Sequence, residues 1–519
     1  MHRSLMTRAR GFAVLAAVVA LAVGAAPAGA HSQAPKPGAI GIGDPLFPTL
    51  GNGGYDALHY NLSLRYATAA PLQTVSGTVT MVARSTQALS RFNLDFAGDS
   101  VKWVSVNGRS ARFTWTKASE ELSITPKRAI RKNDKFVATV SYTSHTRTQT
   151  PEDQNLPFGW FTVNGGSVTA AQPDFGHDIY PVNDHPADKA SYTIEFDVPE
   201  GTTAVANGDL VFRRSKAGRT FSAYFMREPM ASELIQLAVG QFEVQRQAKT
   251  RGVDVRDVVS SSVANAAKPA LARTPAHLNW MIDRVGRYPF NAYGVLAADE
   301  LFFYALETQT LSLHPAFLVT PPAPPSFYEP IMVHELAHQW FGDSVAPVRW
   351  QDVWLNEGHA DWYQQLYTVE FFGLDLDEYM QAAYQRGNGY RAQYGPVAKP
   401  TGNDIFTLFS PNVYEGGSLV LYALRQVVGT ATFQEIERTW VKTYKDQSVS
   451  TEQFIAHVNR VSHRNLTAFL RHWLYDSTIP PMPGHPDWTA DPVTPSAASS
   501  ARSAVLPTAR ALELGIYKR

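Results

Sequence analysis

Hydrophobic and polar residues alternate along much of the first half of the chain. In LHYNLSLRY, an apolar or aromatic side chain occupies every second position from Leu58 to Tyr66. Successive side chains of a β-strand point to opposite faces, so this pattern predicts a strand with one buried face. The runs VSGTVTMVA, FNLDF and FVATVSY follow, with turn residues between them. Residues 55–245 are therefore predicted to form an antiparallel β domain.

Two dipeptides in this region are typical of tight hairpin turns. Asn107-Gly108 and Asn207-Gly208 each lie between strand-like runs. A type I′ turn needs positive φ at both central residues, which Asn-Gly tolerates better than most pairs. Both dipeptides are therefore predicted to join neighbouring antiparallel strands.

Beyond residue 245 the hydrophobic spacing becomes that of helices. Phe433, Ile436 and Trp440 share one face of ATFQEIERTWVKTY. The following helix is expected to begin at a capping box formed by Ser450 and Gln453. Residues 246–485 are predicted to form a mainly helical domain with a few strands, so the expected fold class is α+β with two domains.

The N-terminus differs from the rest of the chain. Three arginines precede an apolar run at 12–26, and Ala28-Gly29-Ala30 supplies small residues before a cleavage point. This pattern is typical of a secretory signal peptide, and the run is short for a bilayer span, which needs about 20 apolar residues. We expect residues 1–30 to be removed and the product to be secreted. An uncleaved anchoring helix is the alternative.

Pro-rich segments flank the two predicted domains. A Pro- and Gly-rich leader covers 31–54, and a Pro-, Ala- and Ser-rich segment at 486–519 predicts a flexible C-terminal tail.

Composition narrows the possible partners and ligands. The 519 residues include 46 basic and 46 acidic side chains, so no basic excess indicates nucleic-acid binding. No segment after the N-terminal run is long and apolar enough for a membrane span. Because the chain has no cysteine, any zinc has to be bound by His, Asp or Glu. We expect a monomer.

The clearest chemical motif is HELAHQWFGDSV at 334–345. Pro330 is expected in the first turn of a buried helix, where its missing N–H is not needed. His334 and His338 lie about one turn apart and about 40° around the helix axis, so both imidazoles can reach one metal ion. Glu335 lies about 100° away, where it can contact a water on that ion without being a ligand.

A third ligand is expected because catalytic zinc generally has three protein ligands and one open position. Glu357, in WLNEGHADWYQQLY, follows His338 after eighteen intervening residues. That distance allows the first helix to end, a loop to turn the chain and a second helix to begin. His359 is the alternative ligand, although it points to another face of that helix. The sequence therefore predicts one zinc ion bound by His334, His338 and Glu357.

HELAHQWFGD followed at this distance by the glutamate of WLNEG resembles the signature of the gluzincin aminopeptidases, which include aminopeptidase N and leukotriene hydrolase. The resemblance covers most of residues 40–485 and implies a thermolysin-like catalytic domain in a short, secreted, bacterial-type member. Larger members carry a further C-terminal helical domain, which this chain is expected to lack. The implied activity is zinc-dependent removal of N-terminal residues from peptides with a free N-terminus.

The same resemblance assigns roles to further residues. Glu307 in FFYALETQT matches the glutamate of the family's G-x-M-E-N stretch, which binds the substrate α-amine, although Tyr304 and Thr308 replace its glycine and asparagine. Gln172 falls where members carry Glu or Gln beside that amine. Tyr414 matches the tyrosine of Y-E-K-G, here YEGG. The replacements leave the preferred N-terminal residue open.

These residues form a coherent catalytic hypothesis. Zinc would activate a water, Glu335 would accept its proton, and Tyr414 would stabilise the oxyanion. A buried Glu307 would pair with a protonated amine, whereas an internal peptide segment would leave it unpaired. ETQTLSL alternates like a strand whose edge could bind an extended peptide. A secreted zinc endopeptidase and an inactive zinc-binding protein are the alternative functions.

Overall fold

The computed structural model describes residues 34–67, 73–147 and 156–492. The described residues from Pro35 onward form one compact unit, to which all the contacts below belong. The predicted signal peptide and most of the predicted C-terminal tail lie outside the described residues. Among the described residues, no helix is both long and apolar enough to cross a membrane.

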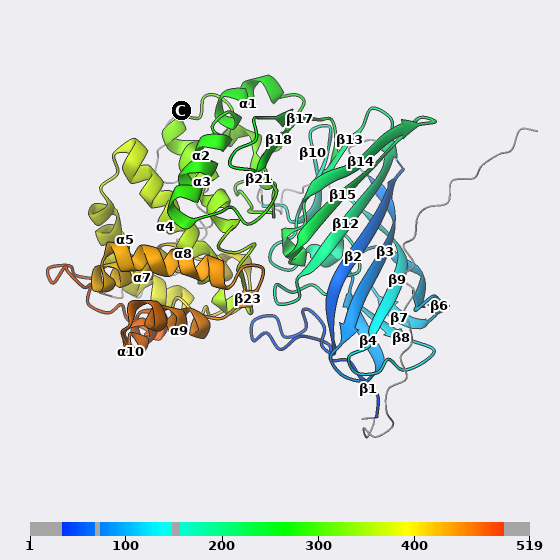
Figure 1. Ribbon diagram of the computed structural model, residues 1–519, viewed down its shortest axis with the longest axis horizontal. Coiled ribbons are helices and arrows are strands. Elements are labelled where there is room, and N and C mark those ends of the chain that lie inside the picture. Colours follow the sequence, from blue (N-terminus) through cyan, green and yellow to red (C-terminus); the bar gives the residue numbers. More distant parts are fainter. Residues whose placement is uncertain (1–33, 68–72, 148–155, 493–519) are drawn as a thin grey trace, which may run out of the picture. The chain divides into compact units, whose positions relative to one another are not determined.

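The N-terminal half is built on an eight-stranded sheet (Figure 1). Its strands, in spatial order, are β14 (Asp209–Lys216), β15 (Arg219–Met230), β12 (Ala190–Pro199), β2 (Tyr55–Tyr66), β3 (Thr74–Ser85), β9 (Lys135–His145), β5 (Ser100–Val106) and β6 (Arg109–Ser110). The alternation that predicts β2 is confirmed, because its side chains at 60, 62, 64 and 66 are buried. The sheet is antiparallel except between β12 and β2, which pair in parallel.

Two four-stranded sheets complete the β-rich half. One contains β1 (Lys36–Pro37), β4 (Leu89–Asp95), β8 (Glu121–Thr125) and β7 (Arg112–Thr116). The other contains β10 (Gly159–Val163), β11 (Gly166–Ala170), β16 (Leu237–Gly240) and β13 (Thr203–Ala206). Most of their pairings are antiparallel, so the N-terminal half agrees with the predicted β domain.

The two predicted hairpin turns have different outcomes. Asn107-Gly108 joins the antiparallel pair β5 and β6 with positive φ at both residues. The prediction for Asn207-Gly208 is wrong, because β13 pairs with β16 whereas β14 pairs with β15. The Asn207 side chain explains the difference: it donates to two backbone carbonyls and accepts the N–H of Gln236 at 2.7 Å. These contacts hold the dipeptide between separate sheets.

A further, five-stranded sheet and the helices make up the C-terminal half. The sheet contains β17 (Phe242–Arg246), β18 (Asp254–Ser260), β20 (Val295–Ala298) and β21 (Ser312–Pro315), with β19 (Ala292–Tyr293) paired to β18. The helices are α1 (Ala264–Leu271), α2 (Thr274–Val285), α3 (Pro325–His338), α4 (Trp354–Phe372), α5 (Leu376–Tyr394), α6 (Ile405–Leu408), α7 (Pro411–Val428), α8 (Thr430–Thr443), α9 (Thr451–Ser462) and α10 (Thr467–Tyr475). A β-rich domain is thus followed by a mainly helical one, as predicted.

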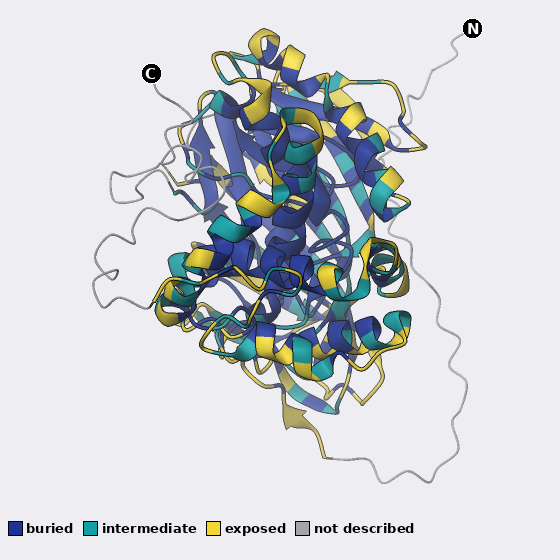
Figure 2. Ribbon diagram, turned by 90° about the vertical axis from the view of Figure 1, so that its left-hand side faces the viewer, coloured by how far each residue is buried: buried dark blue, intermediate teal, exposed yellow. Residues whose placement is uncertain are grey.

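The helices of the C-terminal half differ in how far they are buried. Figure 2 shows buried ribbon in the interior and exposed stretches on several outer helices. Helix α3 is buried at every position from Phe327 to His338, whereas α8 buries mainly the predicted face that carries Phe433, Ile436 and Trp440. The predicted capping box of α9 is present, since Ser450 and Gln453 bond each other's backbone N–H.

Segments assigned to the leader and the tail make specific contacts. Asp44 Oδ2 accepts the Trp350 backbone N–H at 2.7 Å and lies 3.2 Å from His185 Nε2. Near the other end, the Trp488 ring stacks on Tyr422 with an interplanar angle of 5°. The leader therefore links the β-rich half to the short turn at Trp350–Asp352 that precedes α4, and Trp488 packs on α7.

Candidate metal centre

Helix α3 carries both histidines of the motif on one buried face. It begins at Pro325, which occupies the first helical position, so the prediction that Pro330 lies in the first turn is wrong. Pro325 suits the helix start because its missing N–H needs no partner there. The rings of His334 and His338 lie 4.8 Å apart between centroids, one helical turn from each other.

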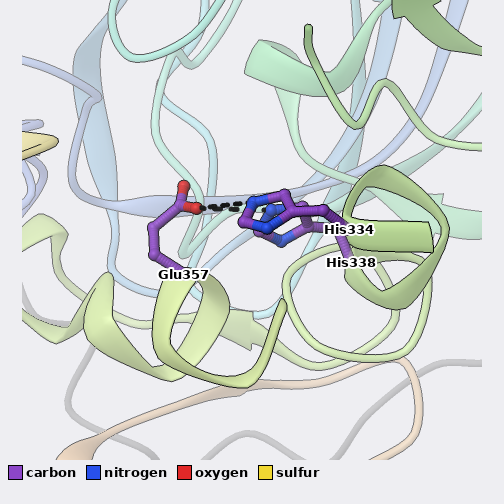
Figure 3. A group of neighbouring side chains, drawn as sticks. All are labelled: His334, His338 and Glu357. Carbon is purple, nitrogen blue, oxygen red and sulfur yellow. Dashed lines mark ion pairs between the residues drawn. The ribbon is translucent and has the colours of Figure 1, made fainter. Parts of the chain in front are cut away.

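Helix α4 brings Glu357 to the two histidines (Figure 3). Glu357 lies in the first turn of α4, and its Oε2 atom is 3.4 Å from His334 Nε2 and 3.3 Å from His338 Nε2. All three side chains are buried. The loop between the helices includes Gly342, whose φ of 139° is a conformation that favours glycine, so this residue helps to turn the chain back.

The donor atoms of this trio fit a metal ion. One ligand atom from each of His334, His338 and Glu357 lies within 4.8 Å of the others. Glu357 Oε2 has no hydrogen-bond partner although it is buried. Two imidazole nitrogens and one carboxylate oxygen are a donor set that suits zinc. A buried carboxylate oxygen without a hydrogen bond is costly, and a cation at this position would remove the cost.

His359, the alternative ligand, lies away from this trio. Its Nδ1 is 2.8 Å from the Leu355 carbonyl oxygen, and its ring stacks on Phe341 at 4.4 Å between centroids. Nε2 faces Glu437 at 3.4 Å. His359 therefore has its own partners in the helical core.

The charges of the site depend on one another. Burial raises the pKa of Glu357, but the neighbouring His338 and His334 outweigh it and hold that pKa at about 2. Burial raises the pKa of Glu335 well above its ordinary value, and Glu307 and Glu357 add to the rise while His338 opposes it. A divalent cation among these carboxylates would favour their charged forms.

Glu335 and Glu307 lie close to each other, beside the predicted metal ligand His338. Ligand atoms of Glu307, Glu335 and His338 lie within 4.8 Å of one another, and all three residues are buried. Gln172, which follows β11, donates from Nε2 to Glu307 Oε1 at 2.7 Å. The structure thus places together two residues that are 135 positions apart in sequence.

Tyr414 completes the group of predicted site residues. It lies in the first turn of α7, and its ring stacks on His334 at 5.9 Å between centroids. Burial, and then the nearby carboxylates, raise the pKa of its phenol well above the usual value, so the hydroxyl keeps its proton. It lines one small cavity with Gln172, Glu307, Glu335 and the predicted metal ligands.

The segment from Glu307 to Leu313 differs from its prediction, and the residue that shapes it was missed. The segment ETQTLSL is not a continuous strand, because Thr310 has a φ of 68° and the strand β21 begins only at Ser312. Gln339 explains this fold, since its side chain donates to the Glu307 carbonyl oxygen at 2.9 Å and accepts the Thr310 N–H at 2.8 Å. Sequence reasoning missed Gln339 as a residue that positions Glu307.

The orientation of His338 also has a partner that the sequence did not reveal. Its Nδ1 lies 3.1 Å from the Phe341 carbonyl oxygen, which leaves Nε2 directed at Glu357. Such a hydrogen bond fixes the ring nitrogen that is available to a metal. No sequence pattern could have identified it, because the partner is a backbone atom.

A β-rich domain joined to a helical domain, with paired histidines and a distant glutamate on neighbouring helices, defines a zinc metallopeptidase. Comparison with known families agrees: residues 56–233 match the Peptidase M1 N-terminal domain and residues 270–473 match the Peptidase family M1 domain. The chain therefore belongs to the M1 family of zinc metallopeptidases.

Solved structures show the same architecture. The chain is similar to an M1 zinc metallopeptidase from Deinococcus radiodurans, with 29% identity and a TM-score of 0.74 over 85% of this chain and 99% of that one. A mutant of that enzyme bound to a Tyr-Ser-Ala substrate gives a TM-score of 0.75 at 29% identity, with the same coverage.

Curated relatives are more distant and longer. Aminopeptidase M1-A of Oryza sativa subsp. japonica is 25% identical over 60% of this chain, and leukotriene A-4 hydrolase of Xenopus laevis is 22% identical over 76%. The aligned region spans 37% of the rice protein's length and 66% of the frog protein's length.

Proposed function

We propose that this chain is a zinc-dependent aminopeptidase, which hydrolyses the first peptide bond of substrates that have a free N-terminus. The observation that carries the proposal is the buried Glu307 carboxylate, which shares a cavity with the His334, His338 and Glu357 trio and accepts a hydrogen bond from Gln172. An endopeptidase would have no use for an anion at this position.

In this proposal His334, His338 and Glu357 hold one zinc ion through two nitrogen atoms and one oxygen atom. When bound, zinc polarises a scissile carbonyl and makes a water more acidic. The Phe341 carbonyl and the first turn of α4 hold the ligand atoms in place before the metal binds. This preorganisation reduces the entropy that binding would otherwise lose.

Glu335 is proposed as the general base and then the general acid. Its carboxylate lies within 4.8 Å of the His338 ligand atom, so a water at the centre is within its reach. It would take a proton from the attacking water and deliver it to the departing amine nitrogen. Burial and the neighbouring Glu307 and Glu357 carboxylates raise its pKa, so Glu335 can hold the proton between the two transfers.

Tyr414 is proposed to stabilise the oxyanion. Its hydroxyl keeps its proton and can donate a hydrogen bond to the carbonyl oxygen as negative charge develops there. Its ring stacks on His334, which fixes its orientation.

Glu307 and Gln172 are proposed to bind the α-ammonium group. A protonated amine placed at Glu307 replaces the solvation that this buried carboxylate has lost, whereas an acylated amine cannot. Gln172 holds one carboxylate oxygen through a 2.7 Å hydrogen bond, and its own carbonyl oxygen can accept from the ammonium group. Binding of the α-ammonium group at Glu307 would thereby place the first peptide bond of a substrate at the metal centre.

The test is a panel of aminoacyl chromogenic amides, each supplied free and N-acetylated, assayed with and without a chelator. We expect hydrolysis of the free amides only, with loss on chelation and recovery on adding zinc. A Glu307→Gln variant should raise KM for the free amides. Equal rates on free and acetylated substrates would contradict the proposal and favour an endopeptidase. Zinc binding with no hydrolysis of any substrate would favour a binding protein.

We also propose that the protein is secreted after removal of residues 1–30. The support is the arginine-flanked apolar run and the Ala28-Gly29-Ala30 sequence that follows it. N-terminal sequencing of protein recovered from the culture medium of an expressing bacterium tests this. A mature N-terminus at His31 would agree, and full-length chain that remains with the cells would count against export.

A further inference from the structure

One wall of the metal-centre cavity has no role in the mechanism proposed above. Seven of the lining residues are polar, and each is proposed to act on the metal, the attacking water, the scissile carbonyl group or the α-ammonium group. The other lining residues, which we call the apolar wall, are Phe158, Tyr304, Ala305, Leu306, Ile405 and Phe409. The first side chain of a substrate leaves the carbon atom between the amine and the carbonyl group. It therefore has only the apolar wall to contact.

Tyr304 contributes to this wall a ring that is held in place. The residue is 1% exposed, and its hydroxyl donates to the Pro157 carbonyl oxygen. Its ring stacks on Phe158, at 5.1 Å between centroids and an interplanar angle of 13°. The Phe302 ring contacts it too, at 5.1 Å and 57°. Moving the ring out of the wall would break all of these contacts.

Phe158 is supported in turn by a third ring. It stacks on Phe175 at 5.3 Å between centroids, again with an interplanar angle of 13°. Phe175, Phe158 and Tyr304 thus form a continuous aromatic stack, and two of its three rings line the cavity. Close-packed aromatic side chains yield little to a group that presses against them. The wall therefore has a fixed shape.

The cavity that these side chains leave is small. It measures about 20 Å³, and one buried water alone needs about 10–15 Å³. A methyl group is close to a water molecule in size, whereas isobutyl and benzyl groups are much larger. Tyr304 stands where the G-x-M-E-N stretch has glycine, so its ring occupies space that a glycine would leave open.

We propose that Tyr304 is a specificity-determining residue, which restricts the first residue of the substrate to a small apolar side chain, with alanine preferred. This restriction rests on the aminopeptidase function proposed above. A large apolar side chain would have to displace the Tyr304 ring from Phe158 and Pro157. A charged side chain would lose its hydration against the apolar wall without gaining a partner.

The ratios of kcat/KM on chromogenic amides of alanine, leucine, phenylalanine and lysine test this restriction. We expect wild type to favour the alanine amide over each of the others at least about tenfold. Tyr304→Ala should reduce the alanine-to-phenylalanine ratio at least about tenfold, because the space of the ring becomes available. The matched control is Phe303→Ala, since the Phe303 ring packs on Phe317 and does not line the cavity. It should keep the wild-type ratio.

A binding measurement separates this restriction from catalysis. Calorimetry gives Kd values for alanine hydroxamate and phenylalanine hydroxamate on the zinc-loaded protein, and we expect at least about tenfold tighter binding of the alanine compound. If wild type hydrolyses none of the amides, the proposed function fails, and these Kd values still decide the role of Tyr304. Circular dichroism shows whether Tyr304→Ala folds. Tyr304→Leu, which keeps an apolar side chain, replaces it if it does not.

Three results would overturn the assignment. Wild type could prefer the phenylalanine or lysine amide, or bind both hydroxamates equally. The alanine-to-phenylalanine ratio could be the same in Tyr304→Ala as in wild type. Hydrolysis of N-acetylated amides by Tyr304→Ala would place the ring beyond the amine-binding residues Glu307 and Gln172 rather than beside the first side chain.

Discussion

Glu335 follows directly after His334 on α3 and is not part of the His334, His338 and Glu357 trio. Its chemical role can therefore be separated from metal binding. Glu335→Gln keeps the size of the side chain and removes the proton acceptor. We expect kcat on a free aminoacyl amide to fall about 10²–10⁴-fold, since general acid–base groups contribute factors of that size.

Metal analysis of the same preparation is the necessary companion measurement. Glu335→Gln should retain one zinc per chain, because the trio is intact. Glu378→Gln, an exposed glutamate on α5, is the matched control and should keep the wild-type rate. Loss of zinc together with activity in Glu335→Gln would mean that the residue supports the metal rather than the proton transfer.

Tyr414 gives a second prediction at the level of a single atom. Tyr414→Phe removes the proposed oxyanion donor and leaves the ring on His334. We expect kcat to fall about 10²–10³-fold with KM changed much less, because the hydrogen bond forms in the transition state. Tyr422→Phe is the control, since Tyr422 lies on the same helix but its hydroxyl contacts Asp377 and His485. A purely structural Tyr414 would instead raise KM and lower thermal stability.

At the scale of elements, the site depends on how closely α4 and α7 approach. A Cβ atom added to Gly417 would lie 2.7 Å from the Cα atom of Gly358, so the two helices touch through their backbones. Glu357 precedes Gly358 on α4, and Tyr414 lies one turn before Gly417 on α7. The spacing of these two side chains therefore depends on a pair of glycines.

Gly417→Ala should push the two helices apart. We expect it to reduce the free energy of unfolding by about 1–3 kcal/mol through overpacking, and to lower both zinc affinity and kcat. Gly389→Ala is the matched control, because a Cβ atom added to this glycine of α5 would meet no atom within 4 Å. Alanine should be neutral or slightly stabilising there. Thermal midpoints and zinc titration measure both variants, and equal behaviour would contradict the close-contact account.

The elements that carry the metal ligands could be predicted because their geometry is local. The positions of His334 and His338 one turn apart follow from the helix period, and the spacing to Glu357 allows a loop and a second helix. The alternation in β2 and the capping box at Ser450 are also local patterns. In each case neighbouring residues in the sequence are neighbours in the fold.

Features that depend on distant contacts could not be predicted in the same way. Asn207-Gly208 has the composition of a hairpin turn, but hydrogen bonds to residues 234, 236 and 309 place it between sheets. The alternation in ETQTLSL does not give a strand throughout, because Gln339 on another element holds the turn at Thr310. Pairing between Gln172 and Glu307 was suggested by the family resemblance alone.

At the scale of the whole molecule, the N-terminal leader fastens the two halves to each other. The buried Asp44 side chain accepts the N–H groups of Leu46 and Trp350, each at 2.7 Å, and contacts His185. Burial raises the pKa of Asp44, but the hydrogen bonds with His185, Trp350 and Leu46 together outweigh it, so the carboxyl has a lower pKa in the folded protein than its ordinary value. Folding therefore favours the charged form.

Asp44→Ala should lower the free energy of unfolding by about 1–3 kcal/mol at pH 7, since hydrogen bonds to charged groups are lost. The contribution of a carboxylate with a depressed folded pKa is present above its unfolded pKa of 3.8 and is lost as the pH falls through the folded pKa. The difference in thermal midpoint between wild type and Asp44→Ala should thus be constant from pH 7 to about 5 and narrow below about 4. A constant difference down to pH 3 would show that Asp44 acts through packing.

The proposed catalysis depends on zinc being bound by two histidines of α3 and one glutamate of α4. Anomalous diffraction from a crystal of the protein, recorded at the zinc absorption edge, tests this most directly. We predict one strong peak about 2.0–2.2 Å from His334 Nε2, His338 Nε2 and a Glu357 carboxylate oxygen. A zinc-loaded, active protein whose peak lies elsewhere, or whose Glu357 does not reach the metal, would contradict the account.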